Sequence, residues 1–166
     1  MLDQAPLVDV RDLSVHFRSG GYTVKAVDGI SFRIGKGETV ALVGESGSGK
    51  TVSALSIMRL LPYPAASHPT GEVQFAGKDL LRASLHEMRE IRGEKISIIF
   101  QEPMTSLNPL HTIEKQVGEI MKLHHGLDDQ TVRRRVLELL RKVGLPEPQK
   151  RLGAFPHQLS GGQRQR

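Results

Sequence analysis

The 166-residue chain contains no cysteine and no tryptophan, and only seven of its residues are Phe or Tyr. The absence of cysteine excludes a disulfide framework, a thiolate metal site and a cysteine nucleophile. No apolar run approaches the roughly 20 residues of a membrane-spanning helix, and the acidic start at residues 1–4 does not resemble a secretory signal. We therefore expect a protein that is cytoplasmic or peripheral on a membrane.

The composition is that of a globular chain. Hydrophobic residues account for 38% and charged residues for 25%, which distinguishes the sequence from disordered and fibrous proteins. Lys and Arg exceed Asp and Glu by 23 to 18, and the formal net charge of +5 suits a polyanionic ligand or an anionic membrane surface without requiring either. The length fits one ordinary domain with its own hydrophobic core.

Alternating apolar and polar residues predict strands in the first part of the chain. The alternation runs over residues 7–17, stops at a turn signal at 19–21 and resumes over 24–34, which predicts an antiparallel hairpin. A short strand is predicted at residues 72–75. Residues 38–43 and 96–100 are apolar over most of their length and predict strands buried on both faces, as in a parallel sheet covered by helices.

Apolar residues at helical spacing follow. Residues 51–61, 85–91, 113–123 and 131–143 each place apolar side chains on one face of a helix. The last helix is entered through the capping residues Asp128 and Asp129 and is closed by glycine and proline.

The chain therefore divides into two parts of different character. Residues 1–100 are β-rich, and residues 101–166 are α-rich. This order of elements predicts an α/β fold.

Residues 44–51 read Gly-Glu-Ser-Gly-Ser-Gly-Lys-Thr and match the P-loop pattern G-x-x-x-x-G-K-[ST] at every fixed position. Glycines let backbone amides approach the phosphates of a nucleotide, with a helix dipole behind them. We expect Lys50 to reach the β- and γ-phosphate oxygens and the Thr51 hydroxyl to ligate Mg²⁺. The candidate nucleotide-binding residues are Gly44, Glu45, Ser46, Gly47, Ser48, Gly49, Lys50, Thr51 and Val52.

A second turn of small residues, Leu159-Ser160-Gly161-Gly162-Gln163, stands at the start of a predicted helix and can also present amides to an anion. Together with the P-loop, this motif resembles the ATP-binding cassette (ABC) family, whose signature reads LSGGQ. In that family two cassettes pair head to tail, and the signature of one closes on the ATP held by the other. The resemblance therefore assigns Ser160, Gly161, Gly162 and Gln163 to ATP on a partner cassette.

The resemblance also implies roles for single residues. Gln101 matches the Q-loop glutamine, which in the family contacts Mg²⁺ and the attacking water and links the site to the membrane partner. Phe17 matches the aromatic that stacks on adenine, with Tyr22 as the competing candidate and simple hairpin packing as the alternative for either. Val52 departs from the pattern, because many members place there a Thr whose hydroxyl helps to hold the α-phosphate. The candidate catalytic residues are thus Lys50 and Gln101, and the candidate Mg²⁺ ligands are Thr51 and Gln101.

Within the ABC family, the segment Phe-Gln-Glu-Pro-Met-Thr-Ser-Leu-Asn-Pro at residues 100–109 is similar to importers of the dipeptide, oligopeptide and nickel group. Residues 110–113 and 156–159 continue the likeness. With Leu61-Pro62-Tyr63-Pro64, these residues most resemble the microcin C-type peptide importers, in which one polypeptide carries two cassettes. The resemblance implies an ATP-binding subunit that couples ATP hydrolysis to peptide uptake, with ATP and Mg²⁺ as its ligands.

The implied fold is an ABC-type P-loop NTPase. An antiparallel β subdomain and a parallel-sheet core would occupy residues 1–100, and the Q-loop and a helical subdomain ending at the signature would occupy residues 101–166. The implied partners are two membrane permease subunits, a second cassette in a head-to-tail dimer and, indirectly, an extracytoplasmic peptide-binding protein. The implied location is peripheral, on the cytoplasmic face of the inner membrane.

The sequence contains no apolar strand ending in Asp-Glu and no switch histidine after the signature. We therefore expect the 166 residues to be the N-terminal part of a longer cassette, exposing apolar strand edges and inactive alone. Two alternatives are a nucleotide-binding but catalytically incompetent fragment and a non-transport ABC ATPase, for example one of DNA repair.

Two clusters receive a plainer interpretation. His124 and His125 point about 100° apart on a helix and have no further ligand at metal-binding spacing, which favours solvated surface over a metal site. Arg133, Arg134 and Arg135 lie on an amphipathic helix, where such a run is typical of a solvated face rather than of nucleic-acid binding.

Overall fold

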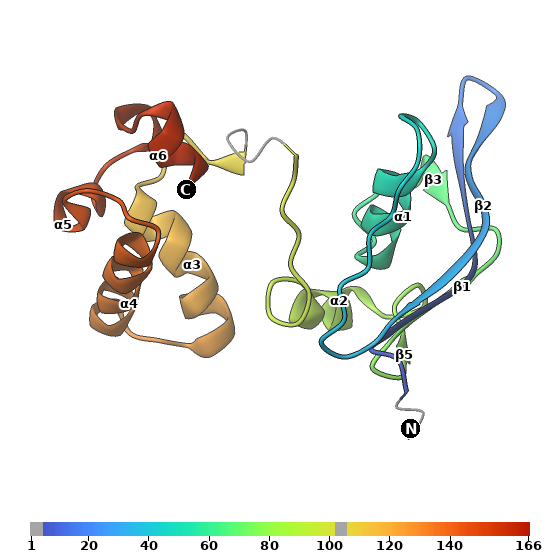
Figure 1. Cartoon of the computed structure of the whole chain (residues 1–166), viewed down its shortest axis with the longest axis horizontal. Coiled ribbons are helices and arrows are strands. Elements are labelled where there is room, and N and C mark those ends of the chain that lie inside the picture. The colour runs from blue at the N-terminus through green and yellow to red at the C-terminus, as the bar shows by residue number, and fades with distance from the viewer. Residues whose placement is uncertain (1–4, 102–105) are drawn as a thin grey trace. The chain divides into compact units, whose positions relative to one another are not determined.

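The computed structural model describes residues 5–101 and 106–166. The chain forms two compact units, Met1–Arg92 and Gly93–Arg166 (Figure 1). The first unit contains the strands and the second contains most of the helices. Each unit is described separately below.

The sheet of the first unit is built on a long hairpin. Strand β1 (Val8–Ser19) pairs antiparallel with β2 (Tyr22–Ile34), and β4 (Glu72–Phe75) pairs antiparallel with the other edge of β1. The short strands β3 (Ala66–Ser67) and β5 (Lys78–Asp79) add to β1 and β4 respectively. The predicted hairpin and the predicted strand at residues 72–75 are both confirmed.

The hairpin contains an irregularity that bears on the site. Val15 pairs with Val27, but the next pair is His16 with Lys25, so Ala26 has no partner on β1. A β-bulge of this kind bends the strand and alters the direction of nearby groups. Ala26 lies at the edge of the candidate site described below.

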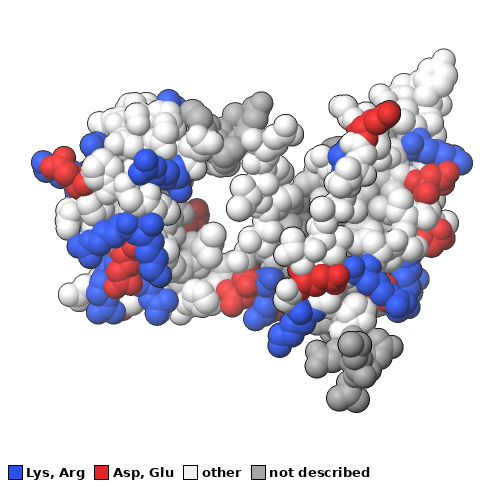
Figure 2. All heavy atoms as spheres, viewed as in Figure 1, with Lys and Arg blue, Asp and Glu red and all other residues white. Residues whose placement is uncertain are grey.

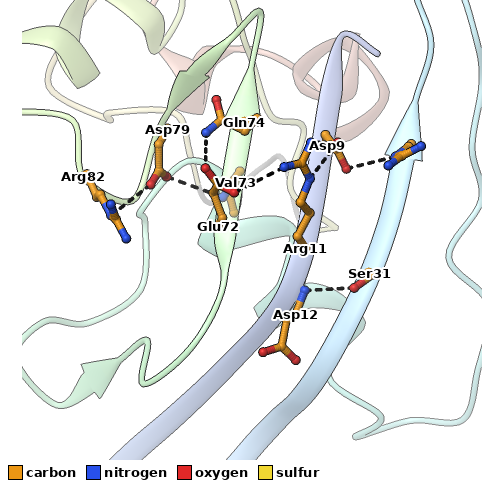
Figure 3. A network of polar contacts seen from close by, with 10 residues as sticks. Asp9, Arg11, Asp12, Ser31, Glu72, Val73, Gln74, Asp79 and Arg82 are labelled. Atoms are coloured by element: carbon orange, nitrogen blue, oxygen red, sulfur yellow. Dashed lines mark hydrogen bonds and ion pairs between the residues drawn. The ribbon is translucent and has the colours of Figure 1, made fainter. Parts of the chain in front are cut away.

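Ion pairs connect neighbouring strands of the sheet (Figure 3). The carboxylate of Asp9 on β1 accepts hydrogen bonds from Arg11 at 2.9 and 2.6 Å and from Arg33 of β2 at 3.2 Å. Arg11 also lies 3.6 Å from Glu72 of β4, so one guanidinium bridges two strands. The hydrogen bonds from Arg11, followed by the one from Arg33, hold the pKa of Asp9 below its usual value.

Two helices accompany this sheet. Helix α1 (Lys50–Ile57) lies within the helix predicted at residues 51–61, apart from its first residue. Helix α2 (Leu85–Ile91) matches its prediction and begins with a capping box formed by Ser84 and Glu87. The apolar core of the unit comprises Val8, Val10, Leu13, Val15, Val27, Met58, Leu61, Ala66, Val73, Leu80, Ala83, Met88 and Ile91.

The prediction of buried strands at residues 38–43 and 96–100 is wrong. Neither segment forms a strand, and the side chains of Val43 and Ile99 are 91% and 90% exposed. A strand is stable only when its backbone groups pair with a neighbour. Among residues 5–101 and 106–166 no strand pairs with either segment, and every pairing is antiparallel, so the parallel-sheet core is not formed in this chain.

The second unit is helical. Its elements are α3 (Ile113–His125), α4 (Asp129–Lys142), α5 (Pro148–Arg151), the 3-10 turn η2 (Pro156–Gln158) and α6 (Gly161–Gln165). The predictions of helices at residues 113–123 and 131–143 are confirmed, and Asp128 caps α4 by accepting a hydrogen bond from the Thr131 amide at 3.0 Å.

Helices α3 and α4 cross at a glycine. A Cβ added to Gly118 would lie 2.5 Å from Cγ1 of the buried Val132, so no larger residue fits there without movement. The core around this crossing comprises Ile113, Val132, Val136, Leu140, Leu145, Leu152, Ala154 and Leu159. It is a continuous apolar cluster that holds the second unit together.

The outer face of α4 is basic. Figure 2 shows Lys and Arg side chains gathered over this helix, and Arg133, Arg134, Arg135, Arg141 and Lys142 are all exposed. Arg133 is paired with Glu114 of α3 at 2.9 Å. In the described part of the chain, no helix is both long enough and apolar enough to cross a membrane.

Candidate functional site

The P-loop leads directly into helix α1. Gly49 is the N-cap of the helix and has φ 86°, a left-handed conformation that suits glycine. The loop therefore turns sharply, and the helix begins at Lys50, the residue that the motif assigns to the phosphates. The first amides of such a helix have no partner within it and carry the positive end of its dipole.

The left-handed turn at Gly49 brings the loop against the hairpin. A Cβ added at this position would lie 2.5 Å from the carbonyl oxygen of Ala26 and 3.1 Å from Cγ2 of Val27. Glycine is required here for space as well as for backbone conformation. Ala26 was not among the residues predicted from the sequence, because the bulge that brings it here depends on the register of the hairpin.

The ammonium group of Lys50 lies within the P-loop. It donates hydrogen bonds to the carbonyl oxygens of Gly44 at 2.8 Å and Glu45 at 2.6 Å, and to Oγ of Ser48 at 3.1 Å. These contacts hold the positive charge against the loop. An anion there would meet both the ammonium group and the first amides of α1.

A small cavity of about 160 Å³ opens at this point. It is lined by Ala26, Gly47, Gly49, Lys50, Thr51 and Val52. None of these residues carries a carboxylate, and one carries a positive charge, so the cavity suits an anion. Five of the nine candidate nucleotide-binding residues line this cavity, with Val52 half-buried, whereas Gly44, Glu45, Ser46 and Ser48 do not line it. Their role in binding phosphate stays a prediction.

The side chains present also fit a magnesium ion bound together with phosphate. Thr51 is exposed in the first turn of α1 and offers a hydroxyl oxygen. Mg²⁺ keeps several of its waters and needs only one or two protein ligands when phosphate oxygens supply others. In the described ranges no group of three or more His, Cys, Asp or Glu could hold a metal ion by itself, His124 and His125 included.

The two candidates for adenine stacking differ in their surroundings. Phe17 is half-buried in β1, opposite Val24 of β2 and Ala66 of β3. Tyr22 is 80% exposed at the tip of the hairpin, opposite Ser19. Both aromatics belong to the unit that carries the P-loop, and the assignment of Phe17 stays a prediction.

The remaining predicted site residues belong to the second unit. Gln101 is exposed, directly before residues 102–105, which lie outside the described ranges. Ser160 is the N-cap of α6: its hydroxyl accepts from the Gln163 amide at 3.3 Å, and the Gln163 side chain accepts from the Ser160 amide at 3.1 Å. Gly161 and Gly162 are exposed beside this cap.

The loop, the helix that follows it and the ammonium group of Lys50 over the loop have the arrangement typical of P-loop proteins. Residues 27–166 match the family described as ABC transporter. Because this match covers most of the sequence, the chain belongs to the ABC transporter family.

Curated relatives include ATP-binding proteins of peptidoglycan and oligopeptide transport. The chain is 62% identical over 161 residues to the peptidoglycan transport ATP-binding protein YejF of Agrobacterium fabrum, covering 97% of this chain and 30% of that protein. It is 46% identical to the oligopeptide transport ATP-binding protein OppD of Bacillus subtilis, over 100% of this chain and 46% of that protein. The chain thus spans less than half the length of either relative.

The structure is also similar to solved ABC cassettes. The dimeric structure of MJ0796, a bacterial ABC transporter cassette, matches 95% of this chain and 65% of that chain with a TM-score of 0.79 at 28% identity. A post-hydrolysis state of MJ0796 bound to ADP and Pi matches the same shares with a TM-score of 0.76 at 26% identity. The predicted ABC-type fold is confirmed.

Proposed function

We propose that this chain binds ATP with Mg²⁺ at the P-loop and forms the ATP-binding part of an importer that couples ATP hydrolysis to peptide uptake. The observation that carries the proposal is the position of Lys50. Its ammonium group is held over the loop by two carbonyl oxygens at 2.8 and 2.6 Å, at the N-terminal end of α1. Such an arrangement provides charge and amide donors for the phosphates of a nucleotide.

Each proposed residue has a separate role. Lys50 neutralises the β- and γ-phosphates, and the amides between Gly47 and Thr51 bind their oxygens. The Thr51 hydroxyl and the Gln101 side chain are the proposed ligands of Mg²⁺, which would supply charge neutralisation at the phosphates. Gln101 would also orient the attacking water, and Phe17 would stack on the adenine.

We retain the proposed division of the chain into an ATP-binding part at residues 1–100 and a helical part at residues 101–166.

The signature residues support a partner cassette. Gly161 and Gly162 have nothing within 4 Å of an added Cβ, and neither has a left-handed φ. Neither the backbone conformation nor the packing within residues 5–101 and 106–166 therefore requires glycine at these positions. Close approach by a ligand on another chain would require it, which agrees with the dimer of the similar cassette MJ0796.

The relatives support the transport role. YejF, OppD and the dipeptide transport ATP-binding protein DppD of Bacillus subtilis are all ATP-binding proteins of transport systems, for peptidoglycan, oligopeptides and dipeptides. By analogy we propose membrane permease subunits as partners, a peripheral position at the cytoplasmic face of the inner membrane, and an indirect role for a peptide-binding protein. The closer likeness to microcin C-type importers stays a prediction.

Nucleotide titration tests the proposal. The affinity for Mg-ATP is measured for the wild type, for Lys50→Ala and for Lys36→Ala, which removes the same charge from an exposed site outside the P-loop. A charge-assisted hydrogen bond is worth about 1.5–3 kcal/mol, so Lys50→Ala should weaken binding roughly 10- to 100-fold while Lys36→Ala changes it little. Equal affinity of the wild type and Lys50→Ala would overturn the proposal.

A second candidate is nucleotide binding without turnover. No residue lining the described cavity carries a carboxylate that could polarise an attacking water. We therefore propose that the 166 residues alone bind nucleotide but release phosphate at no more than the rate of Lys50→Ala. Phosphate release that depends on Lys50 in the purified chain would refute this candidate and support hydrolysis by the chain itself.

A further inference from the structure

The C-terminal end of α1 is held by two arginines. Arg92, the last residue of the first unit, donates from Nε to the carbonyl oxygen of Met58 at 2.9 Å and from Nη2 to that of Arg59 at 2.8 Å. Arg59 in turn donates from Nη1 to the carbonyl oxygen of Ala83. The end of α1 is thereby connected to the segment that precedes α2 and to the residue that follows it.

These contacts complete an unusual helix terminus. The amide of Arg59 donates to Ser56 at 3.0 Å and that of Leu60 donates to Leu55 at 2.9 Å, the bonding pattern of a Schellman motif. Glycine is common at the left-handed position of this motif, but here Arg59 occupies it with φ 51°. The motif uses the carbonyls of Leu55 and Ser56, and Arg92 satisfies those of Met58, the C-cap residue, and of Arg59.

Within helix α1 itself, only small polar side chains are buried. It is eight residues long, and its buried residues are Ser53 and Ser56 rather than large apolar side chains. Both serine hydroxyls donate back to the helix itself, Ser53 to Gly49 at 2.9 Å and Ser56 to Val52 at 2.8 Å. A helix of two turns transmits a tilt at one end directly to the other, where Lys50 and Thr51 begin it.

We propose that Arg92 is a positioning residue of the phosphate site, which sets the location of Lys50 and Thr51 by anchoring the opposite end of α1. This inference rests on the proposed function, because it concerns how tightly the site binds a nucleotide. The bidentate geometry of Arg92 is specific to a guanidinium, whose planar fork reaches two carbonyls at once. Lysine at this position would keep the charge but lose the fork.

The test compares Arg92→Gln, Arg92→Lys and a matched control, Arg89→Gln. Arg89 lies three residues earlier, on α2, is exposed, and makes no hydrogen bond or ion pair among the described residues. Arg89→Gln therefore removes the same charge as Arg92→Gln without removing a contact. Mg-ATP affinity is measured well below the unfolding temperature of each variant. We expect binding roughly tenfold weaker in Arg92→Gln, intermediate in Arg92→Lys and unchanged in Arg89→Gln.

A second readout needs no nucleotide. The amide resonances of Gly49 and Thr51 should shift in Arg92→Gln and Arg92→Lys but not in Arg89→Gln, because only the former release the helix end. A purely structural role would lower the unfolding temperature without moving these resonances or the affinity of the folded protein. If Arg92→Gln does not fold, Arg92→Lys decides the question by the same two measurements.

The outcomes separate the two proposals. Folded Arg92 variants with wild-type affinity and unshifted Gly49 and Thr51 amides would overturn the positioning role while leaving the nucleotide site intact. Equal affinity of wild type and Lys50→Ala would overturn the proposed function, and the amide shifts would then still decide whether Arg92 positions α1.

Discussion

The ammonium group of Lys78 lies 2.5 Å from the carboxylate of Glu87, the residue that also closes the capping box of α2. Glu87 accepts a further hydrogen bond from the Ser84 amide at 2.7 Å. Hydrogen bonding to Lys78, and then to Ser84, lowers the pKa of Glu87 from 4.5 to about 2. One partly exposed carboxylate thus joins β5 to the start of α2, and these contacts depend on its staying ionised.

Lowering the pH should therefore reduce the stability of the first unit by protonating Glu87. A carboxyl with a lowered pKa in the folded state contributes stability that is complete above its unfolded pKa and is lost as pH falls from 4.5 toward 2. Glu87→Gln should remove this contribution, so the variant should be less stable than the wild type above this pH range. The difference between their free energies of unfolding should shrink as pH falls through the range. Denaturant titrations at several pH values measure the difference.

The control for this prediction is Asp28→Asn. Asp28 is exposed on β2 and makes no hydrogen bond or ion pair in the described ranges. Removing its exposed, unpaired charge should change the free energy of unfolding only slightly. A Glu87→Gln difference from wild type that does not change with pH would contradict the account.

Gly49 should tolerate no side chain. Gly49→Ala places a Cβ 2.5 Å from the backbone oxygen of Ala26 in a left-handed conformation. Gly47→Ala is the matched comparison, because Gly47 has φ 82° but open space around an added Cβ. We expect both variants to lose stability, and Gly49→Ala should lose about 1–3 kcal/mol more than Gly47→Ala. Gly49→Ala should also lose nucleotide binding. Equal losses of stability in denaturant titrations would contradict the contact with the hairpin.

Gly118→Ala should destabilise the second unit. The added methyl group would meet Val132, which is only 2% exposed, at 2.5 Å and would force α3 and α4 apart. Overpacking of this kind costs about 1–3 kcal/mol. Gly153→Ala provides the control, because an added Cβ there meets nothing within 4 Å. Helical circular dichroism during denaturation measures the loss, and a Gly118→Ala transition unchanged from wild type would count against the crossing.

Val52→Thr should strengthen nucleotide binding. Val52 lines the cavity beside Thr51, and threonine has nearly the same shape but adds a hydroxyl. One new hydrogen bond to a phosphate oxygen is worth about 0.5–1.5 kcal/mol, or roughly two- to tenfold in affinity. Val24→Thr makes the same chemical change at a position that is 59% exposed on the hairpin. If the two variants bind Mg-ATP with equal affinity, position 52 does not face the nucleotide.

Local patterns predicted much of this fold. Amphipathic spacing and the cap at Asp128 located α4 to within about two residues, and the P-loop pattern located the start of α1. Alternation alone did not predict the bulge at Ala26, since a bulge depends on the pairing register between two strands. The apolar run at residues 38–43 signals strand propensity, but a strand also needs a paired neighbour, which this segment lacks in the described ranges.

The candidate site, like the fold, could be predicted only in part from the sequence. The motif itself predicted Lys50 and Thr51, whereas Arg92 belongs to no motif and is recognisable only from its contacts with the two carbonyls directly after α1. A single arginine after an amphipathic helix has no sequence signal that separates it from a solvated side chain.

Amide resonances on addition of nucleotide test the central claim most directly. If the P-loop cradles the phosphates, saturating Mg-ATP should shift the backbone amides of Gly47, Gly49, Lys50 and Thr51 in the wild type and leave them in place in Lys50→Ala at the same concentration. The helical core around Val136 should be unaffected. Wild-type P-loop amides that do not move at saturating Mg-ATP would contradict the account.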